Sequence, residues 1–170
     1  ALPSHKFFIA FAGDIVRAGE DSSDYEAFIR EMDGQLDAIG LERDVRIVAP
    51  GNHDLDQRSV EEAFDQCIQA YDEHTGEEEK FNDFIDNSTL LTGHFSNYEG
   101  FVRQFARCDD SFQARGWGCS LNEEVGVYCL NTALCSFGGL KDINDEGRLA
   151  SYTRDLVEWC RKTTCPVKIL

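Results

Sequence analysis

Residues 45–54 read Val45-Arg46-Ile47-Val48-Ala49-Pro50-Gly51-Asn52-His53-Asp54, an apolar run followed by a glycine and three polar side chains. The apolar run predicts a buried strand, and the polar residues then lie where α/β folds collect their chemistry. Glycine lets the backbone turn sharply, and the asparagine carboxamide offers a neutral oxygen to a hard cation. The histidine can donate a proton, and the aspartate can orient it. The stretch therefore predicts an α/β fold with a functional site at a strand end.

The same pattern occurs upstream in Phe7-Phe8-Ile9-Ala10-Phe11-Ala12-Gly13-Asp14, where an apolar run again ends in a glycine and a carboxylate. The residues between the two runs predict a helix, so the whole stretch reads as a strand, helix, strand unit. Such a unit brings the carboxyl ends of both strands to one edge of the sheet. We therefore expect Asp14 and Asn52 to converge.

The helix in this unit has apolar side chains at helical spacing from residue 25 to residue 39. Ser23 and Glu26 have the spacing of a capping box, which predicts the start of the helix. Gly40 predicts its end.

Together, Gly13-Asp14 and Gly51-Asn52-His53-Asp54 resemble two of the metal-site motifs of the calcineurin-like metallophosphoesterases. Residues 127–133, Val-Tyr-Cys-Leu-Asn-Thr-Ala, look like a family strand that runs into its Asn-Ser/Thr-Ala turn. The other family motifs, an Asp-x-His, a later histidine and a final Gly-His-x-His, are not found. His94 in Gly93-His94-Phe95-Ser96 is a weak candidate for the last motif, because a serine replaces the second histidine and no strand precedes it.

The resemblance implies a fold and a set of roles. The fold would be a layered αββα sandwich of the α/β class, and the activity would be hydrolysis of phosphomonoesters or phosphodiesters with two divalent metal ions such as Mn, Fe or Zn. Asp14 would bridge the metals and Asn52 would bind one of them. His53 would protonate the leaving oxygen, and Asp54 would hold its imidazole. A phosphorylated substrate is the expected ligand.

The motifs that are not found suggest that the domain is incomplete at both ends. Val167-Lys168-Ile169-Leu170 reads as the start of a buried strand, which in the family leads into a histidine-bearing loop. We expect flanking polypeptide of a longer protein to supply the remaining ligands. By itself, the segment of residues 1–170 is expected to be a poor enzyme, because each metal would lack several ligands.

The rest of the chain divides into a helical segment and a return to the core. Residues 72–120 predict a helical insertion or cap beside the site. Two further capping boxes, Ser59 with Glu62 and Ser96 with Glu99, predict helix starts before and inside it. A strand at 125–130, loops at 138–139 and 142–147, an amphipathic helix from 149 to 160 and the final strand then follow.

Composition narrows the function classes. The 170 residues carry a net charge of −16 and no basic stripe, which disfavours binding to nucleic acid through this segment. No run has the length of a transmembrane helix, so no membrane contact is expected. Seven cysteines without a Cys-x-x-Cys pair predict reduced thiols in a cytoplasmic protein.

Two alternatives to the phosphoesterase remain open. One is a nuclease of the same family, which would need a basic or aromatic element outside this acidic segment. The other is a noncatalytic protein-interaction module that keeps the fold and has lost the metal centre. Outside the motifs, Asn131 is expected to stabilise a turn, and His5, His74 and His94 are expected to be exposed.

Overall fold

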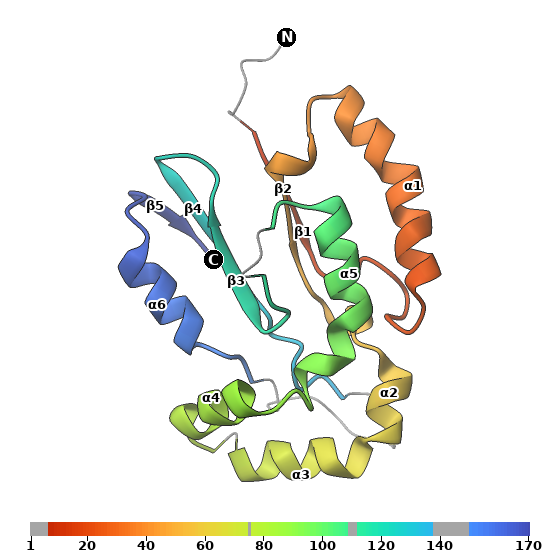
Figure 1. Cartoon of the computed structure of the whole chain (residues 1–170), viewed down its shortest axis with the longest axis vertical. Coiled ribbons are helices and arrows are strands. Elements are labelled where there is room, and N and C mark those ends of the chain that lie inside the picture. The colour runs from red at the N-terminus through yellow and green to blue at the C-terminus, as the bar shows by residue number, and fades with distance from the viewer. Residues whose placement is uncertain (1–6, 75, 109–111, 138–149) are drawn as a thin grey trace.

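A computed structural model describes residues 7–74, 76–108, 112–137 and 150–170. Its first unit consists of strand β1 (Ile9–Ala12), helix α1 (Ser22–Ala38) and strand β2 (Arg46–Ala49). The two strands are parallel and in register from the pair Ile9 and Arg46 to the pair Ala12 and Ala49, so they end level with each other. The predicted strand, helix, strand unit is confirmed (Figure 1).

The helix starts differ from the predicted capping boxes. Asp21 caps α1 by accepting a hydrogen bond from the Ser23 backbone N–H at 2.8 Å. Asp56 caps α2 (Gln57–Glu62) in the same way, with the Ser59 N–H at 3.1 Å. In both cases an aspartate earlier in the chain reaches the free N–H groups, and the predicted serine lies inside the helix.

The third predicted box, at Ser96, is also wrong. Helix α5 (Ser96–Phe105) has no side-chain cap, because the chain enters it from the short 3₁₀ helix η3 (Thr92–Phe95). The Ser96 N–H already donates to the Gly93 carbonyl. The end of α1 agrees with the prediction, since Gly40 has a left-handed φ of +79° directly after the helix.

The middle of the chain is helical up to β3. It contains α3 (Phe64–His74), α4 (Glu78–Asn87), η3 and α5, and two further 3₁₀ turns, η1 (Arg43–Val45) and η2 (Asn52–Asp54), flank β2. Strand β3 (Gly116–Ser120) lies inside the predicted insertion of residues 72–120, so the end of that range belongs to a sheet.

Helix α5 packs on α1 and covers β1. The ring of Phe28 on α1 lies 5.3 Å from that of Phe105 and 5.7 Å from that of Phe101, and Phe11 on β1 contacts Phe28 at 5.9 Å. These edge-to-face contacts join helix to helix and helix to sheet. Helix α5 is therefore part of the core layer over β1 and β2 (Figure 1).

The second sheet has the order β3-β4-β5, with β4 at Val125–Leu130 and β5 at Val167–Ile169. Strands β3 and β4 are antiparallel, and β4 and β5 are parallel. The predicted strand at 125–130 is confirmed. The final strand also forms, but it is not buried, since Val167 is 49% exposed and the following Leu170 is 75% exposed.

Helix α6 (Arg154–Lys162) lies against the outer side of this sheet through Trp159. A Cβ on Gly118 would lie 2.4 Å from the indole nitrogen, and one on Gly126 would lie 2.9 Å from the ring. The two glycines therefore form the flat surface that receives the indole. The helix begins later than predicted, and the loops expected at 138–139 and 142–147 lie outside the described residues.

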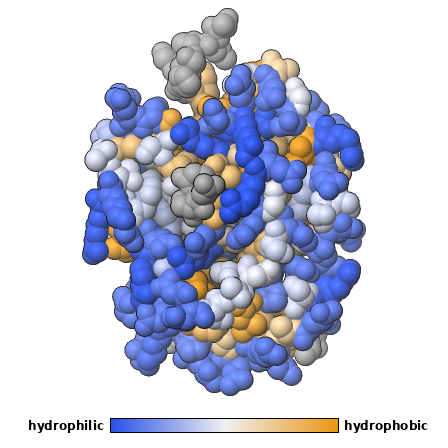
Figure 2. Space-filling model, viewed as in Figure 1, coloured by the Kyte–Doolittle hydropathy of each residue, from blue (hydrophilic) through white to orange (hydrophobic). Residues whose placement is uncertain are grey.

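These elements make an α/β fold of two small sheets with helices outside them (Figure 1). The visible face in Figure 2 is mostly hydrophilic, as the high charge predicts. None of the seven cysteines forms a disulfide bond, and all seven lie within the described residues. Within the described ranges no helix has the length and apolar character needed to cross a membrane.

Candidate functional site

The ends of β1 and β2 meet at two glycines. A Cβ on Gly13 would lie 2.7 Å from the Cα of Gly51, and Gly13 has a φ of +89°. A Cβ on Gly51 would lie 2.2 Å from Oδ1 of Asp14. Both positions thus exclude larger residues, and the contact places Asp14 directly over the start of the second loop.

Asp14 has an unusual backbone and an exposed carboxylate. Its φ of +53° is left-handed, a region that aspartate adopts more readily than most residues. Its Oδ1 accepts the His53 backbone N–H at 3.1 Å. The predicted convergence of the two strand ends is therefore confirmed, because Asp14 hydrogen-bonds within the Asn52–Asp54 turn.

Asn52 is the first residue of the η2 turn, and its side chain is exposed. Among the described residues its carboxamide makes no hydrogen bond. The carboxamide oxygen is therefore available to a ligand from solvent.

His53 is exposed, and its ring is held by a backbone carbonyl. Its Nδ1 lies 2.7 Å from the carbonyl oxygen of Arg17. A carbonyl can only accept, so Nδ1 carries the hydrogen of the neutral imidazole. Nε2 is then the ring atom that can exchange a proton with a substrate.

Asp54 is fully buried, and the partners of its carboxylate among the described residues do not include His53. Its carboxylate accepts hydrogen bonds from the Gly51 N–H at 2.9 Å, the Ile15 N–H at 3.2 Å and the Tyr25 hydroxyl at 3.0 Å. The expectation that Asp54 holds the imidazole is corrected, because the Arg17 carbonyl does so. A 3₁₀ turn has three residues per turn, so adjacent side chains point in different directions.

The buried position changes the titration of Asp54. Burial raises the pKa of its carboxyl above the usual value, and the charge of Asp14 adds to this. The hydrogen bonds from Gly51, Tyr25 and Ile15 oppose the rise. Burial and the charge of Asp54 raise the pKa of the Tyr25 hydroxyl in turn, so it acts as a donor. Asp54 therefore ties both loops of the site to α1.

Sequence reasoning missed three contributors to this site. The spacing of apolar residues predicts only that Tyr25 lies on the apolar face of its helix, and nothing in the sequence indicates a role for the Arg17 carbonyl. Gly19 is buried, and a Cβ there would lie 2.3 Å from the Asp54 carbonyl oxygen. A glycine in a polar loop could have signalled this close approach between the loops.

The other histidines lie elsewhere. His94 is only 9% exposed, so its expected exposure is wrong. Its Nδ1 lies 2.6 Å from the Ser59 hydroxyl and its Nε2 lies 3.6 Å from the Cys67 sulfur, and burial lowers its pKa. His74 is half-buried and stacks on Phe84 at 4.5 Å. His5 lies outside the described residues.

Asn131 stabilises a turn, as expected. It is fully buried at the end of β4. Its amide donates to the Ala114 carbonyl at 2.7 Å, and its oxygen accepts the Ala133 N–H at 2.7 Å. Both ends of the carboxamide are therefore used within the fold.

Two side chains of the site carry oxygen atoms of the kind that divalent cations bind. Asp14 keeps one carboxylate oxygen without a hydrogen-bond partner among the described residues, and Asn52 offers its carboxamide oxygen. Oxygen donors of this kind suit divalent cations. In the part of the chain that the structure describes, no three His, Cys, Asp or Glu side chains form a metal-binding group.

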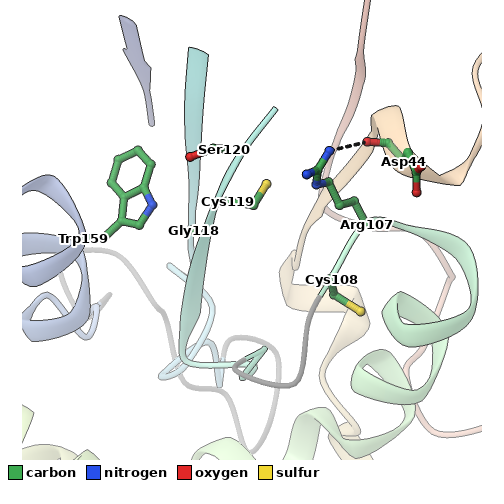
Figure 3. Close-up of a pocket in the computed structure, with 7 residues that line it drawn as sticks. All are labelled: Asp44, Arg107, Cys108, Gly118, Cys119, Ser120 and Trp159. Atoms are coloured by element: carbon green, nitrogen blue, oxygen red, sulfur yellow. Dashed lines mark hydrogen bonds between the residues drawn. The ribbon is translucent and has the colours of Figure 1, made fainter. Parts of the chain in front are cut away.

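A pocket of about 530 Å³ lies apart from these residues, along β3 (Figure 3). Its lining includes Arg107, Cys119 and Trp159, and Arg107 donates to the Asp44 carbonyl at 3.3 Å. None of the predicted site residues line it. The candidate site is therefore a separate, solvent-facing one at the strand ends.

The whole chain was also compared with known proteins. No protein-family model, characterised protein or solved structure matches it.

Proposed function

We propose that this chain carries part of the active centre of a metal-dependent phosphoesterase that hydrolyses phosphomonoesters or phosphodiesters. The observation that supports this proposal is the 3.1 Å hydrogen bond between Asp14 and the His53 N–H. It brings a carboxylate, a carboxamide and an imidazole to one edge of a parallel pair of strands. The sequence motifs and this juxtaposition agree.

The proposal includes the layered αββα arrangement. Helices α1 and α5 lie over β1, and α6 lies over β3 and β4. Strands β2 and β4 of the two sheets lie side by side. The contact between the two sheets and the positions of these helices support a sandwich of two sheets between helices.

Asp14 and Asn52 would hold divalent metal through their oxygens. When bound, a pair of such ions activates the attacking water and neutralises charge on the phosphoryl oxygens. The remaining ligands would come from residues outside those described. Among the described residues, one carboxylate oxygen of Asp14 has no hydrogen-bond partner, which suits a bridging role.

His53 would act on the leaving group. The Arg17 carbonyl keeps the hydrogen on Nδ1, so the second proton of the charged ring resides on Nε2. Nε2 can then donate this proton to the departing oxygen. Asp54 contributes by fixing the two loops and is a positioning residue.

The charge of the chain favours small substrates. A net charge of −16 repels long polyanions, so a small phosphate ester fits this surface better than a nucleic acid. A nuclease is therefore less favoured than a phosphoesterase that acts on small substrates.

Metal binding tests the ligand assignment. Asp14→Asn keeps the size of the side chain and removes its charge, and Asp72→Asn is a matched control at an exposed position of α3. Loss of the free Mn²⁺ signal in electron paramagnetic resonance detects even weak binding. We expect Asp14→Asn and Asn52→Ala to weaken Mn²⁺ binding about tenfold or more, and Asp72→Asn to leave it unchanged.

The measurement uses a protein that includes the flanking polypeptide, and there equal Mn²⁺ binding by all variants, or none by the unmodified form, would overturn the ligand assignment and favour the noncatalytic interaction module. A second measurement follows hydrolysis of aryl phosphate monoesters and diesters. His53→Ala should lower kcat by about 10²–10⁴-fold while Mn²⁺ binding persists. His74→Ala is the control, and unchanged turnover in His53→Ala would remove His53 from the chemistry.

A further inference from the structure

We infer that Asn97, on α5, is a positioning residue that sets the orientation and tautomer of His53. This inference rests on the proposed function for its catalytic consequence, but its structural part stands independently. It assigns to a helix of the middle segment a role in supporting the site.

The first contact is between helix α5 and the loop that follows β1. The Asn97 side-chain amide donates to the Gly19 carbonyl at 2.9 Å. The adjacent Tyr98 holds Asn97 in place, because its hydroxyl donates to the Val48 carbonyl at 3.0 Å. Tyr98 and Val48 are both fully buried. The start of α5 is therefore bound to β2, and the Asn97 carboxamide links the same helix to Gly19.

The second contact joins Gly19 to the η2 turn. Gly19 is buried with its Cα against the Asp54 carbonyl, so close that a Cβ would lie 2.3 Å from the oxygen. The loop therefore has little room to move inward. The Asn97 amide restrains it through the carbonyl, so the loop around Gly19 is fixed by both contacts.

The third contact is the one that bears on chemistry. Arg17, two residues before Gly19, accepts the hydrogen of His53 Nδ1 at 2.7 Å. Two residues of backbone transmit a shift at Gly19 directly to the Arg17 carbonyl. Without that acceptor, either ring nitrogen of a neutral imidazole can carry the hydrogen, and the ring is free to rotate.

Residues 94–97 also contact the loop that carries His53. The His94 carbonyl accepts the Asp56 N–H at 2.9 Å, two residues after Asp54. Residues 94–97 thus hold both the loop that carries Arg17 and the loop that carries His53. The Asn97 side chain is half-buried, so it can be changed with less effect on the core than the buried side chains of His94 and Phe95.

The test uses the tautomer of His53, which does not depend on turnover. The variants are Asn97→Ala, Asn97→Asp and Asn97→Ser. The control is Asn87→Ala on α4, whose amide donates to the Asp83 carbonyl at 2.7 Å. Long-range ¹⁵N–¹H NMR at about pH 9, where imidazole is neutral, reports which nitrogen carries the hydrogen.

We expect the unmodified protein and Asn87→Ala to show His53 with its hydrogen on Nδ1. Asn97→Ala should show a mixture of tautomers. Asn97→Asp should also show a mixture, because a carboxylate of the same size cannot donate a hydrogen bond. Asn97→Ser keeps a donor, so its ratio of His53 tautomers should change less. A single Nδ1–H tautomer in Asn97→Ala and Asn97→Asp would overturn the inference, and Asn97→Asp serves if the alanine variant does not fold.

Kinetics separate this inference from the proposed function. In a protein that hydrolyses an aryl phosphate, Asn97→Ala should lower kcat about tenfold with little change in KM, because the proton donor is misplaced while ligands remain. Absence of turnover in an unmodified protein that includes the flanking polypeptide would count against the proposed function, and the tautomer result would still decide the role of Asn97. An unchanged kcat alongside a shifted tautomer would remove Asn97 from the chemistry.

Discussion

Individual residues at the candidate site are constrained by close backbone contacts as much as by chemistry. Gly13 and Gly51 touch, and Asp14 adopts a left-handed φ above them. Asp54 is buried beneath the turn with three donors on its carboxylate. These contacts make specific substitutions informative.

Gly51→Ala should destabilise the protein. The new Cβ would lie 2.2 Å from Asp14 Oδ1 and 2.5 Å from its backbone nitrogen, so the strand ends must separate. Urea unfolding should show a loss of about 1–3 kcal/mol. Gly34→Ala is the control, because no atom lies within 4 Å of a Cβ there on α1, and it should gain about 0.4–1 kcal/mol. Equal effects of the two variants would contradict the close approach.

Tyr25→Phe should also destabilise the protein, because it removes a donor from the buried Asp54 carboxylate. A hydrogen bond to a charged group contributes about 1.5–3 kcal/mol, which urea unfolding at neutral pH can measure. Tyr128→Phe is the matched control. The Tyr128 hydroxyl is buried and has no hydrogen-bond partner among the described residues, so its removal should be neutral or stabilising. A neutral Tyr25→Phe would show that the hydroxyl contributes nothing to holding Asp54.

At the scale of elements, the short η3 helix connects helices α2 and α3 through His94. His94 on η3 lies between Ser59 of α2 and Cys67 of α3. The Ser59 hydroxyl donates to the Asp56 carbonyl at 2.9 Å, so it accepts the hydrogen on His94 Nδ1, and Nε2 faces the Cys67 thiol. The histidine is thus held neutral where three elements meet, and burial also raises the pKa of the Cys67 thiol to about 11.

Stability should therefore decrease at mildly acidic pH. Burial lowers the pKa of His94 in the folded protein, although the charge of Asp56 partly opposes this. In the unfolded chain the histidine takes up a proton at about pH 6.5. The contribution of neutral His94 is then fully present above pH 6.5 and is lost as the pH falls through 6.5 toward the lower pKa of the folded state.

Urea unfolding between about pH 8 and pH 5 checks this expectation. His94→Gln should remove part of the pH dependence, and His74→Gln, at a half-buried position, should retain it. If His94→Gln kept the full pH dependence, the stability loss would belong to other groups.

The whole molecule carries a net charge of −16, so its folded state is subject to self-repulsion. Salt shortens the Debye length from about 30 Å at 0.01 M to about 8 Å at 0.15 M. Screening should therefore stabilise the fold as a whole. Local ion pairs oppose this only weakly, since many, such as Lys80 with Glu77, are exposed.

Sodium chloride should accordingly raise the urea midpoint of unfolding over this range. Asp72→Lys on the exposed side of α3 reduces the net charge by two and should give a smaller salt response. A midpoint that falls with salt would mean that attractive pairs outweigh the net repulsion.

The fold was predictable from the sequence where it depends on local periodicity. The strand at 125–130 and the unit of β1, α1 and β2 follow from the spacing of apolar residues. Helix starts were less predictable, because Asp21 and Asp56 compete with nearby serines for the same N–H groups. The exposure of Val167 could not be foreseen, since an apolar residue does not specify what packs against it.

The sequence by itself determined that two strand ends, each with a glycine followed by polar residues, would meet. Parallel strands joined by one helix have no other arrangement of their carboxyl ends. Only the tertiary structure decided that Asp54 turns inward to Tyr25 and that His53 rests on the Arg17 carbonyl. It also placed Asn97 beside Gly19. These contacts join residues far apart in the chain, and their geometry depends on how the helices pack, which residue spacing does not encode.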